Sequence, residues 1–305
     1  MPNNLDNIST LLSPIIAHHG SDIALILVGG SIAYGTNTTD SDIDIWILSN
    51  SHDGYKRLKF HKDAPYFQVF DTQIFDIEEY IFFYQNFQNN ALPFRYFDFL
   101  QVYKNRPSLV LYNSGVCDNL LDNIWVIVNS DFRYIDYQSY LDERLGTQCL
   151  LSLSMCNTMR LIGHLVEPLP DKARLSDIQY ELEQYIAFWK QIPILPVKVQ
   201  ITEQFLIIGN TKMMWNTPKK QILKVIQKKL EKISYSGNTY HPKKVVHGYR
   251  AIVSAYTKQL TGKYLLPYHD SFVRDMLAVK KKQISKECIA LKIIKLLSAV
   301  RISEK

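Results

Sequence analysis

Asp42 and Asp44 are the two residues whose type and spacing point most directly to chemistry. They flank Ile43 and precede the apolar residues 45–48, a pattern typical of a strand that enters a core. Side chains alternate along a strand, so we expect both carboxylates on one face, about 6–7 Å apart along the backbone. Such a pair repels itself and loses hydration, so a cation is expected between the two groups. Because Mg²⁺ prefers carboxylate oxygens and keeps positions for water and phosphate, the pair predicts a Mg²⁺ site.

A glycine turn precedes this pair and supplies a phosphate-binding element. Gly29, Gly30 and Ser31 follow the continuous apolar run 23–28, which predicts a buried strand. Glycines let backbone N–H groups approach a triphosphate closely, Ser31 adds a hydroxyl donor, and a helix beginning there directs its positive end to phosphate. Together the two motifs predict an NTP held beside two Mg²⁺ ions, with Mn²⁺ as an alternative, roughly 3.5–4 Å apart.

A third carboxylate is expected among Asp63, Asp71 and Asp76. Asp76 is better explained as the N-cap of a helix over 77–88, with Glu79 completing a capping box. Asp63 precedes a third predicted strand, over 66–75, where a loop role is expected. Asp71 lies within that strand and can place its carboxylate beside the pair, so Asp71 is our choice.

The elements that position these groups change in kind along the chain. A helix over 5–17 and the order strand, glycine turn, strand (41–48), strand, helix predict a small α/β domain with a mixed sheet in residues 1–110. Residues 111–305 are expected to form a mainly α-helical, basic domain, so the fold class is α+β; the break lies within 100–140. No role is assigned to the stretch 168–218. The helical stretches are 141–167, 176–190, 220–233, 243–260 and 279–300.

Charge is distributed unevenly between the two ends of the chain. Residues 1–100 hold 5 Lys and Arg against 12 Asp and Glu, whereas residues 212–305 hold 21 against 5. An acidic N-terminal part and a basic C-terminal part fit a metal-binding half joined to a half that binds a polyanion, RNA above all. The alternative is that the lysines only form solvent-exposed helix faces. No apolar run approaches the roughly 20 residues of a membrane helix, and four dispersed cysteines fit a reducing compartment. We therefore expect a cytoplasmic protein that does not contact a membrane.

The combined motif resembles the signature of the DNA polymerase β superfamily of nucleotidyltransferases. Gly30-Ser31 and Gly35, followed by Ser41-Asp42-Ile43-Asp44-Ile45, carry the resemblance. It implies that the glycine and serine hold the triphosphate, that the paired aspartates bind the metals, and that the third carboxylate is a further ligand or the general base. The catalytic and metal-binding prediction is Asp42, Asp44 and Asp71. The nucleotide-binding prediction is Gly29, Gly30, Ser31, Tyr34, Gly35, Ser41, His247 and Arg250.

Further segments are similar to one branch, the predicted nucleotidyltransferases associated with RNA ligases. Residues 71–80 are similar to its third-carboxylate strand and helix, and residues 243–250 to a later helix with a histidine and an arginine. His247 and Arg250 share a helix face and could grip a phosphate, or serve only as core polar contacts. Tyr34 could stack on a base or simply pack.

The expected activity is template-independent transfer of NMP from an NTP, ATP included, to a hydroxyl of RNA, for example tRNA, with release of pyrophosphate. Two alternatives remain. One is modification of a protein hydroxyl, as in antitoxin-like members of the superfamily. The other is a non-catalytic nucleic-acid-binding module that kept the fold, which the presence of all three carboxylates disfavours.

Overall fold

A computed structural model describes residues 5–38, 41–145, 147–190, 199–235, 242–283 and 292 of the 305-residue chain. The chain divides into two compact units. The first contains residues 1–136 and 261–277, and the second contains residues 137–260 and 278–305. One crossing between the units, from Asp136 to Tyr137, falls inside the interval 100–140. Residues 261–277 return to the first unit. A prediction with a single domain boundary does not include this return.

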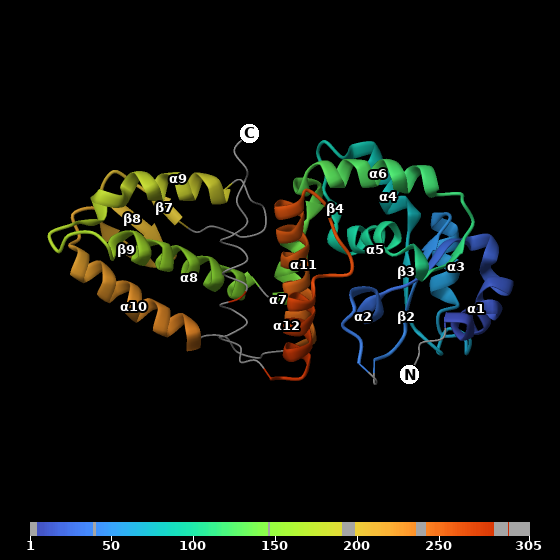
Figure 1. The fold of residues 1–305 in the computed structure, drawn as a ribbon. Helices are drawn as coiled ribbons and strands as arrows, with labels where there is room; N and C mark the ends of the chain where they lie inside the picture. Colours follow the sequence, from blue (N-terminus) through green and yellow to red (C-terminus); the bar gives the residue numbers. More distant parts are fainter. Residues whose placement is uncertain are drawn as a thin grey trace. The chain divides into compact units, whose positions relative to one another are not determined.

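A four-stranded mixed sheet forms the centre of the first unit (Figure 1). Its order is β3-β2-β1-β5, and β1 runs antiparallel to both neighbours while β2 and β3 are parallel. All six residues of β1 are buried, as the continuous apolar run predicted. The expected mixed sheet is confirmed. The strands are β1 (Ile23–Val28), β2 (Asp44–Ser49), β3 (Asp71–Phe75) and β5 (Val110–Asn113).

Helices pack around this sheet. Figure 1 shows α5 on one side of β2 and β3, and α1 and α3 on the other. On the α5 side, Phe99 stacks on Trp46 of β2 at 6.2 Å and contacts Phe75 of β3 at 4.8 Å between ring centroids. A small pair of parallel strands, β4 (Leu92–Pro93) and β6 (Ile135–Asp136), completes the unit. Its helices are α1 (Leu5–His19), α2 (Gly30–Tyr34), α3 (His52–Phe60), α4 (Ile77–Asn86), α5 (Phe94–Asn105) and α6 (Asp118–Ser130).

Two predicted strands are shorter than the sequence suggested. β2 begins at Asp44, and the Ser41 N–H shortly before it donates to the Thr38 carbonyl at 3.1 Å, outside the sheet. β3 begins at Asp71, because turn hydrogen bonds recur every three residues from His61 to Phe70. Asp42 therefore lies before the strand, and the alternation argument applies only from Asp44 onward. The sequence-based placement of Asp42 within a regular strand was wrong.

The second unit contains a hydrophobic core of its own. Helices α8, α9 and α10 and a three-stranded antiparallel sheet of order β7-β8-β9 contribute to it. No strand was predicted for the residues of this sheet, since strands of three and four residues give too short an alternation to detect. The elements are α7 (Tyr137–Leu145), α8 (Thr147–Val166), α9 (Gln179–Lys190), β7 (Val199–Ile201), β8 (Phe205–Ile208), β9 (Thr211–Met214), α10 (Lys219–Tyr235) and α11 (Pro242–Thr261). Helix α12 (Asp270–Lys280) belongs to the first unit up to Leu277, and only its last residues belong to the second.

Four of the five helical stretches expected in this half are helical in the structure, with differences in their ends and divisions. The stretch 141–167 divides into α7 and α8, and the helix expected over 176–190 begins with a 3₁₀ turn (Leu175–Ile178) that leads into α9. The basic helix expected over 279–300 lies almost wholly outside the described residues. Within the part of the chain that is described, no helix is both long and apolar enough to cross a membrane.

Candidate functional site

Gly30 and Asp44 approach each other so closely that no other residue fits at the glycine. A Cβ on Gly30 would overlap the carboxyl group and the Cβ of Asp44. Gly30 also has φ 55°, in the left-handed region that side chains disfavour. The glycine turn and the second aspartate of the predicted motif are therefore in direct contact. Two independent constraints, backbone angle and space, require glycine here.

Asp71 lies directly beside Asp44 in the sheet. The two residues are Cα partners in the parallel pair β2–β3, and the Asp71 N–H donates to the Ile43 carbonyl at 3.1 Å. Side chains of in-register neighbours leave a sheet on the same face, so both carboxylates point to one side at the beginning of their strands. Asp71 is exposed, Asp44 is half-buried, and Asp42, two residues before β2, is exposed.

The described residues contain no group of three or more His, Cys, Asp or Glu side chains arranged to hold one metal ion. The structure thus brings Asp44 and Asp71 to neighbouring positions but does not draw Asp42 into a closed cluster with them. Carboxylate oxygens at the rim of a sheet remain suitable ligands for Mg²⁺, which commonly takes only one or two carboxylates and completes its shell with water and phosphate.

Trp46 forms the floor beneath the glycine turn. A Cβ on Gly29 would overlap its indole ring, so this glycine too is needed for close packing. The Gly29 N–H donates to the Asp44 carbonyl at 2.9 Å and is therefore engaged in the sheet. The N–H groups of Gly30 and Ser31 belong to the first turn of α2, where a helix offers no internal acceptor. Among the three expected turn donors, those of Gly30 and Ser31 are the ones suited to a phosphate.

Two side chains from the α5 region hold the short helix α2 in place. The Tyr34 hydroxyl donates to Oδ2 of Asp98 at 2.7 Å, and Arg106 donates to the Ala33 carbonyl at 2.9 Å. Tyr34 is 3% exposed and stacks on Tyr268 with ring centroids 6.1 Å apart. This position favours the packing role for Tyr34, since a base would need an exposed ring face.

Ser41 and Gly35 shape the loop between the two halves of the motif. Ser41 Oγ accepts from the Thr38 N–H at 2.8 Å, which closes the turn before Asp42. Gly35 ends α2 in the left-handed conformation with φ 72° and has open space around it. Both residues support the loop, and a direct contact to nucleotide stays a prediction.

The two rejected carboxylates have the surroundings expected of them. Asp76 caps α4 by accepting from the Glu78 N–H at 3.1 Å, and its other oxygen contacts Nδ1 of His52 at 2.5 Å. The expected reciprocal bond from Glu79 is not among the described contacts, so the cap is simpler than a capping box. Asp63 is exposed within the turns that precede β3. Neither residue is placed beside Asp44.

His247 and Arg250 lie on α11 in the second unit. Arg250 is buried and donates to the Tyr140 hydroxyl at 3.1 Å. Burial, followed by the charges of Arg250 and Arg144, lowers the pKa of His247 to about 3, so its imidazole is neutral at pH 7. These contacts favour the structural alternative for both residues, and their binding of phosphate stays a prediction.

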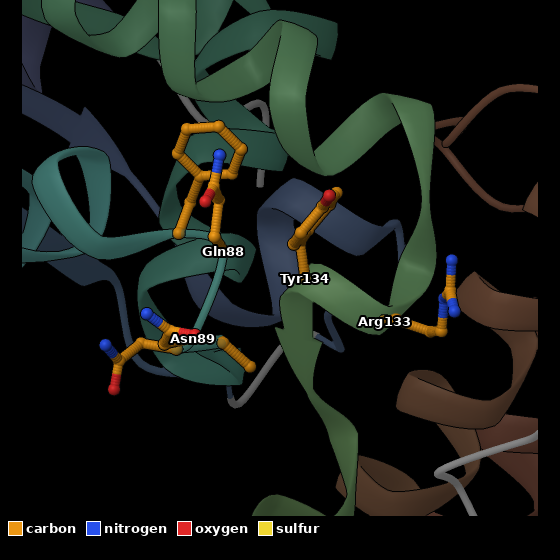
Figure 2. A pocket seen from close by; sticks show the side chains of 7 residues that line it. Gln88, Asn89, Arg133 and Tyr134 are labelled. Atoms are coloured by element: carbon orange, nitrogen blue, oxygen red, sulfur yellow. The ribbon is translucent and has the colours of Figure 1, made fainter.

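A surface pocket of about 380 Å³ lies elsewhere on the first unit (Figure 2). It is formed by the chain that follows α4 and by the 3₁₀ turn that precedes β6. Its lining contains amides and an arginine but no carboxylate, and none of the predicted site residues contributes to it. The lining residues are Phe87, Gln88, Asn89, Asn90, Ala91, Arg133 and Tyr134.

Comparison with known families identifies the class of this region. Residues 11–86 match the family model of the nucleotidyltransferase domain. The matched span contains β1, α2, β2 and β3, and with them the glycine turn, Asp42, Asp44 and Asp71. Neither the curated proteins nor the solved structures gave a match to the chain. The match supports nucleotidyl transfer as the general activity. The matched domain is of the type found in the DNA polymerase β-like superfamily.

Sequence reasoning missed Trp46, Asp98 and Arg106 as parts of this region. Trp46 carried a detectable signal, since it lies two residues after Asp44 and shares its strand face. Asp98 and Arg106 lie more than fifty residues beyond the motif. Only the packing of α5 beside β2 places them under α2, and no local pattern encodes that packing.

Proposed function

We propose that the chain transfers NMP from an NTP to a hydroxyl group of RNA, without a template, at the edge of the sheet where Asp44 lies beside Asp71. The observation that carries the proposal is the arrangement of Asp44, which touches Gly30 on one side and neighbours Asp71 on the other. This arrangement lies within the span that matches the nucleotidyltransferase domain.

The proposal gives each residue a defined task. Gly30 and Ser31 bind the triphosphate through backbone N–H groups and the Ser31 hydroxyl. Asp42 and Asp44 bind metal, and Asp71 accepts the proton of the attacking hydroxyl or acts as a further ligand. Mg²⁺ held there, or Mn²⁺ in its place, would supply charge neutralisation at the phosphates. The donor set fits such an ion because it consists of carboxylate oxygens.

RNA is proposed as the acceptor because of the charge distribution along the chain. Residues 212–305 carry a large excess of Lys and Arg, which suits a polyanionic substrate. A protein hydroxyl would need no such charge. Release of pyrophosphate accompanies transfer, since the α-phosphate forms a bond to the acceptor oxygen as its bond to the β-phosphate oxygen breaks.

The test is Mg²⁺-dependent transfer from each of four α-labelled NTPs to bulk RNA. Wild type is compared with the Asp42→Ala/Asp44→Ala variant, and Asp63→Ala is the matched control in an exposed turn. The proposal predicts label on RNA that the double variant abolishes and the control retains. Label on the protein instead would identify a protein acceptor. Absence of both NTP binding and labelling would refute nucleotidyl transfer.

A further inference from the structure

The helix α10 has two sharply different faces. Ile222 and Ile226 are buried in the core of the second unit. Lys220, Lys224 and Lys228 are exposed and follow one another at intervals of four residues. We call these three residues the lysine row. Residues four apart lie on the same side of a helix, so the row forms one line of positive charge.

The lysine row is not used to hold the fold together. Its three members take part in none of the ion pairs found among the described residues. The neighbouring Lys219 differs, because its Nζ donates to the carbonyls of Glu167 and Leu169 and lies 3.9 Å from Asp171. Lys219 is therefore structural, whereas the row is available to a ligand.

The lysine row also destabilises the helix, so a structural role does not explain why three lysines occupy these positions. Like charges four residues apart repel each other on a helix surface. The sequence of α10 contains one acidic residue, Glu231, three positions after Lys228, and none within 219–230 beside Lys220 and Lys224. An amphipathic helix needs only polar residues on its solvent face, and Gln or Glu would serve that purpose better. A polyanionic partner removes the repulsion by neutralising the charges.

The spacing of the row identifies the kind of polyanion. Each step of four residues advances about 6 Å along the helix axis, and the whole row spans about 12 Å. This period is comparable to the separation of successive phosphates along a nucleic-acid strand. The exposed amide of Gln221 lies beside the row and can donate to phosphate oxygens. A membrane-binding helix would instead expose large apolar side chains, and the apolar side chains within residues 219–230 pack against the core.

We propose that Lys220, Lys224 and Lys228 bind three successive phosphates of a single RNA strand, which is the acceptor. The inference rests on the proposed function for the identity of the acceptor but concerns binding, which can be measured without catalysis. The row would make phosphate contacts without reading bases, so it would hold RNA of any sequence.

The test is binding of a fluorescent single-stranded 12-nucleotide RNA to the full chain, without NTP or Mg²⁺, as a function of salt. The variant is Lys220→Gln/Lys224→Gln/Lys228→Gln. The control removes the same charge from three exposed lysines that are far apart in the chain, Lys56, Lys172 and Lys263. Circular dichroism and thermal melting establish that both variants are folded. Because repulsion is relieved, the row variant should melt no lower than wild type.

The proposal predicts at least a tenfold weaker Kd for the row variant at 0.1 M salt. It also predicts that the slope of log K against log salt becomes shallower by about 2, since each single-strand phosphate contact contributes about 0.7. The control should keep the wild-type slope to within about 0.7. An equal loss of RNA affinity in both variants would mean that the row acts only through the net charge of the protein, and this would overturn the proposal. Absence of RNA binding by the wild type would overturn it as well.

Transfer assays separate this inference from the proposed function. RNA binding that depends on the row, without any nucleotidyl transfer, would leave the inference standing and reject the activity. Transfer to RNA with an unchanged KM for RNA in the row variant would support the activity and reject the inference about the lysine row. The joint prediction is a KM for RNA raised at least tenfold, with little change in kcat at saturating RNA.

Discussion

At the scale of single residues, the contact between Gly30 and Asp44 is the most demanding feature of the site. The glycine has φ 55°, and any side chain on it would overlap the carboxylate. Gly115 offers a matched comparison, because its φ is 79° but nothing lies near its missing Cβ. The two positions share the backbone strain and differ in the steric conflict.

We expect Gly30→Ala to reduce nucleotidyl transfer at least 100-fold, because the methyl group displaces the Asp44 carboxylate. Gly115→Ala should retain transfer. Both variants should lose about 1 kcal/mol of stability from the positive φ, with a further loss in Gly30→Ala from the overlap. Steady-state kinetics and urea denaturation measure the two effects. Retained activity in Gly30→Ala would show that the close approach is dispensable.

His247 makes the stability of the second unit depend on pH. Its pKa is lowered from the ordinary 6.5 to about 3, first by burial and then by Arg250, Arg144, Lys243 and Lys280. Between these two values the unfolded chain binds a proton that the folded chain does not, so this contribution to folding stability falls as pH falls from 6.5 towards 3.

We expect His247→Gln to flatten the decline of stability between pH 6.5 and pH 4. The comparison variant is His164→Gln, whose exposed histidine on α8 should leave the wild-type profile unchanged. Denaturation midpoints measured at intervals of half a pH unit give the profiles. A His247→Gln profile parallel to that of wild type would mean that His247 is protonated in the folded state near its ordinary pKa.

At the scale of elements, α2 depends on α5 for its position. The short helix carries Ser31, and its far end is held by the Tyr34–Asp98 hydrogen bond and by Arg106 on the Ala33 carbonyl. Helices of one turn are unstable alone. The glycine turn that we propose to bind phosphate is therefore expected to keep its geometry only while these contacts persist.

We expect Tyr34→Phe to raise the KM for NTP several-fold and to cost about 1–3 kcal/mol of stability, since it removes a hydrogen bond to the buried Asp98 carboxylate. Tyr103→Phe is the control, because its hydroxyl also donates to an aspartate, Asp118, at 2.8 Å, outside the site. It should lower stability without changing the KM. If the two variants had the same KM for NTP, the position of α2 would not affect nucleotide binding.

The sequence specified the local elements well where pattern and composition agree. The strand Ile23–Val28 was predicted residue for residue, because a run of six apolar residues ends at two glycines. The cap at Asp76 was predicted from its position before an amphipathic run. The strands β5 and β7–β9 were missed, since they are short and their pairing depends on residues distant in the chain. The same reason hid Asp98 and Arg106.

At the scale of the whole molecule, the chain leaves its first unit at Asp136 and returns to it for residues 261–277. Charge segregation along the sequence suggested two halves, but no composition change marks this return. The returning segment contributes real core: Tyr264 packs edge-on against Phe97 of α5 at 4.6 Å, and Tyr268 stacks on Tyr34. The nucleotide-binding prediction on α11 came from a resemblance and from the helix face that His247 and Arg250 share, and it stays a prediction.

The most direct test of the account compares the rates of Mg²⁺-dependent NMP transfer by Asp44→Asn, Asp71→Asn and Asp63→Asn. Asparagine keeps the size of aspartate and removes its charge, and all three positions lie in the matched nucleotidyltransferase span. The account predicts losses of at least 10³-fold for Asp44→Asn and Asp71→Asn, with unchanged melting temperatures, and wild-type activity for Asp63→Asn. Transfer by Asp44→Asn within threefold of wild type would contradict a catalytic centre at this edge of the sheet.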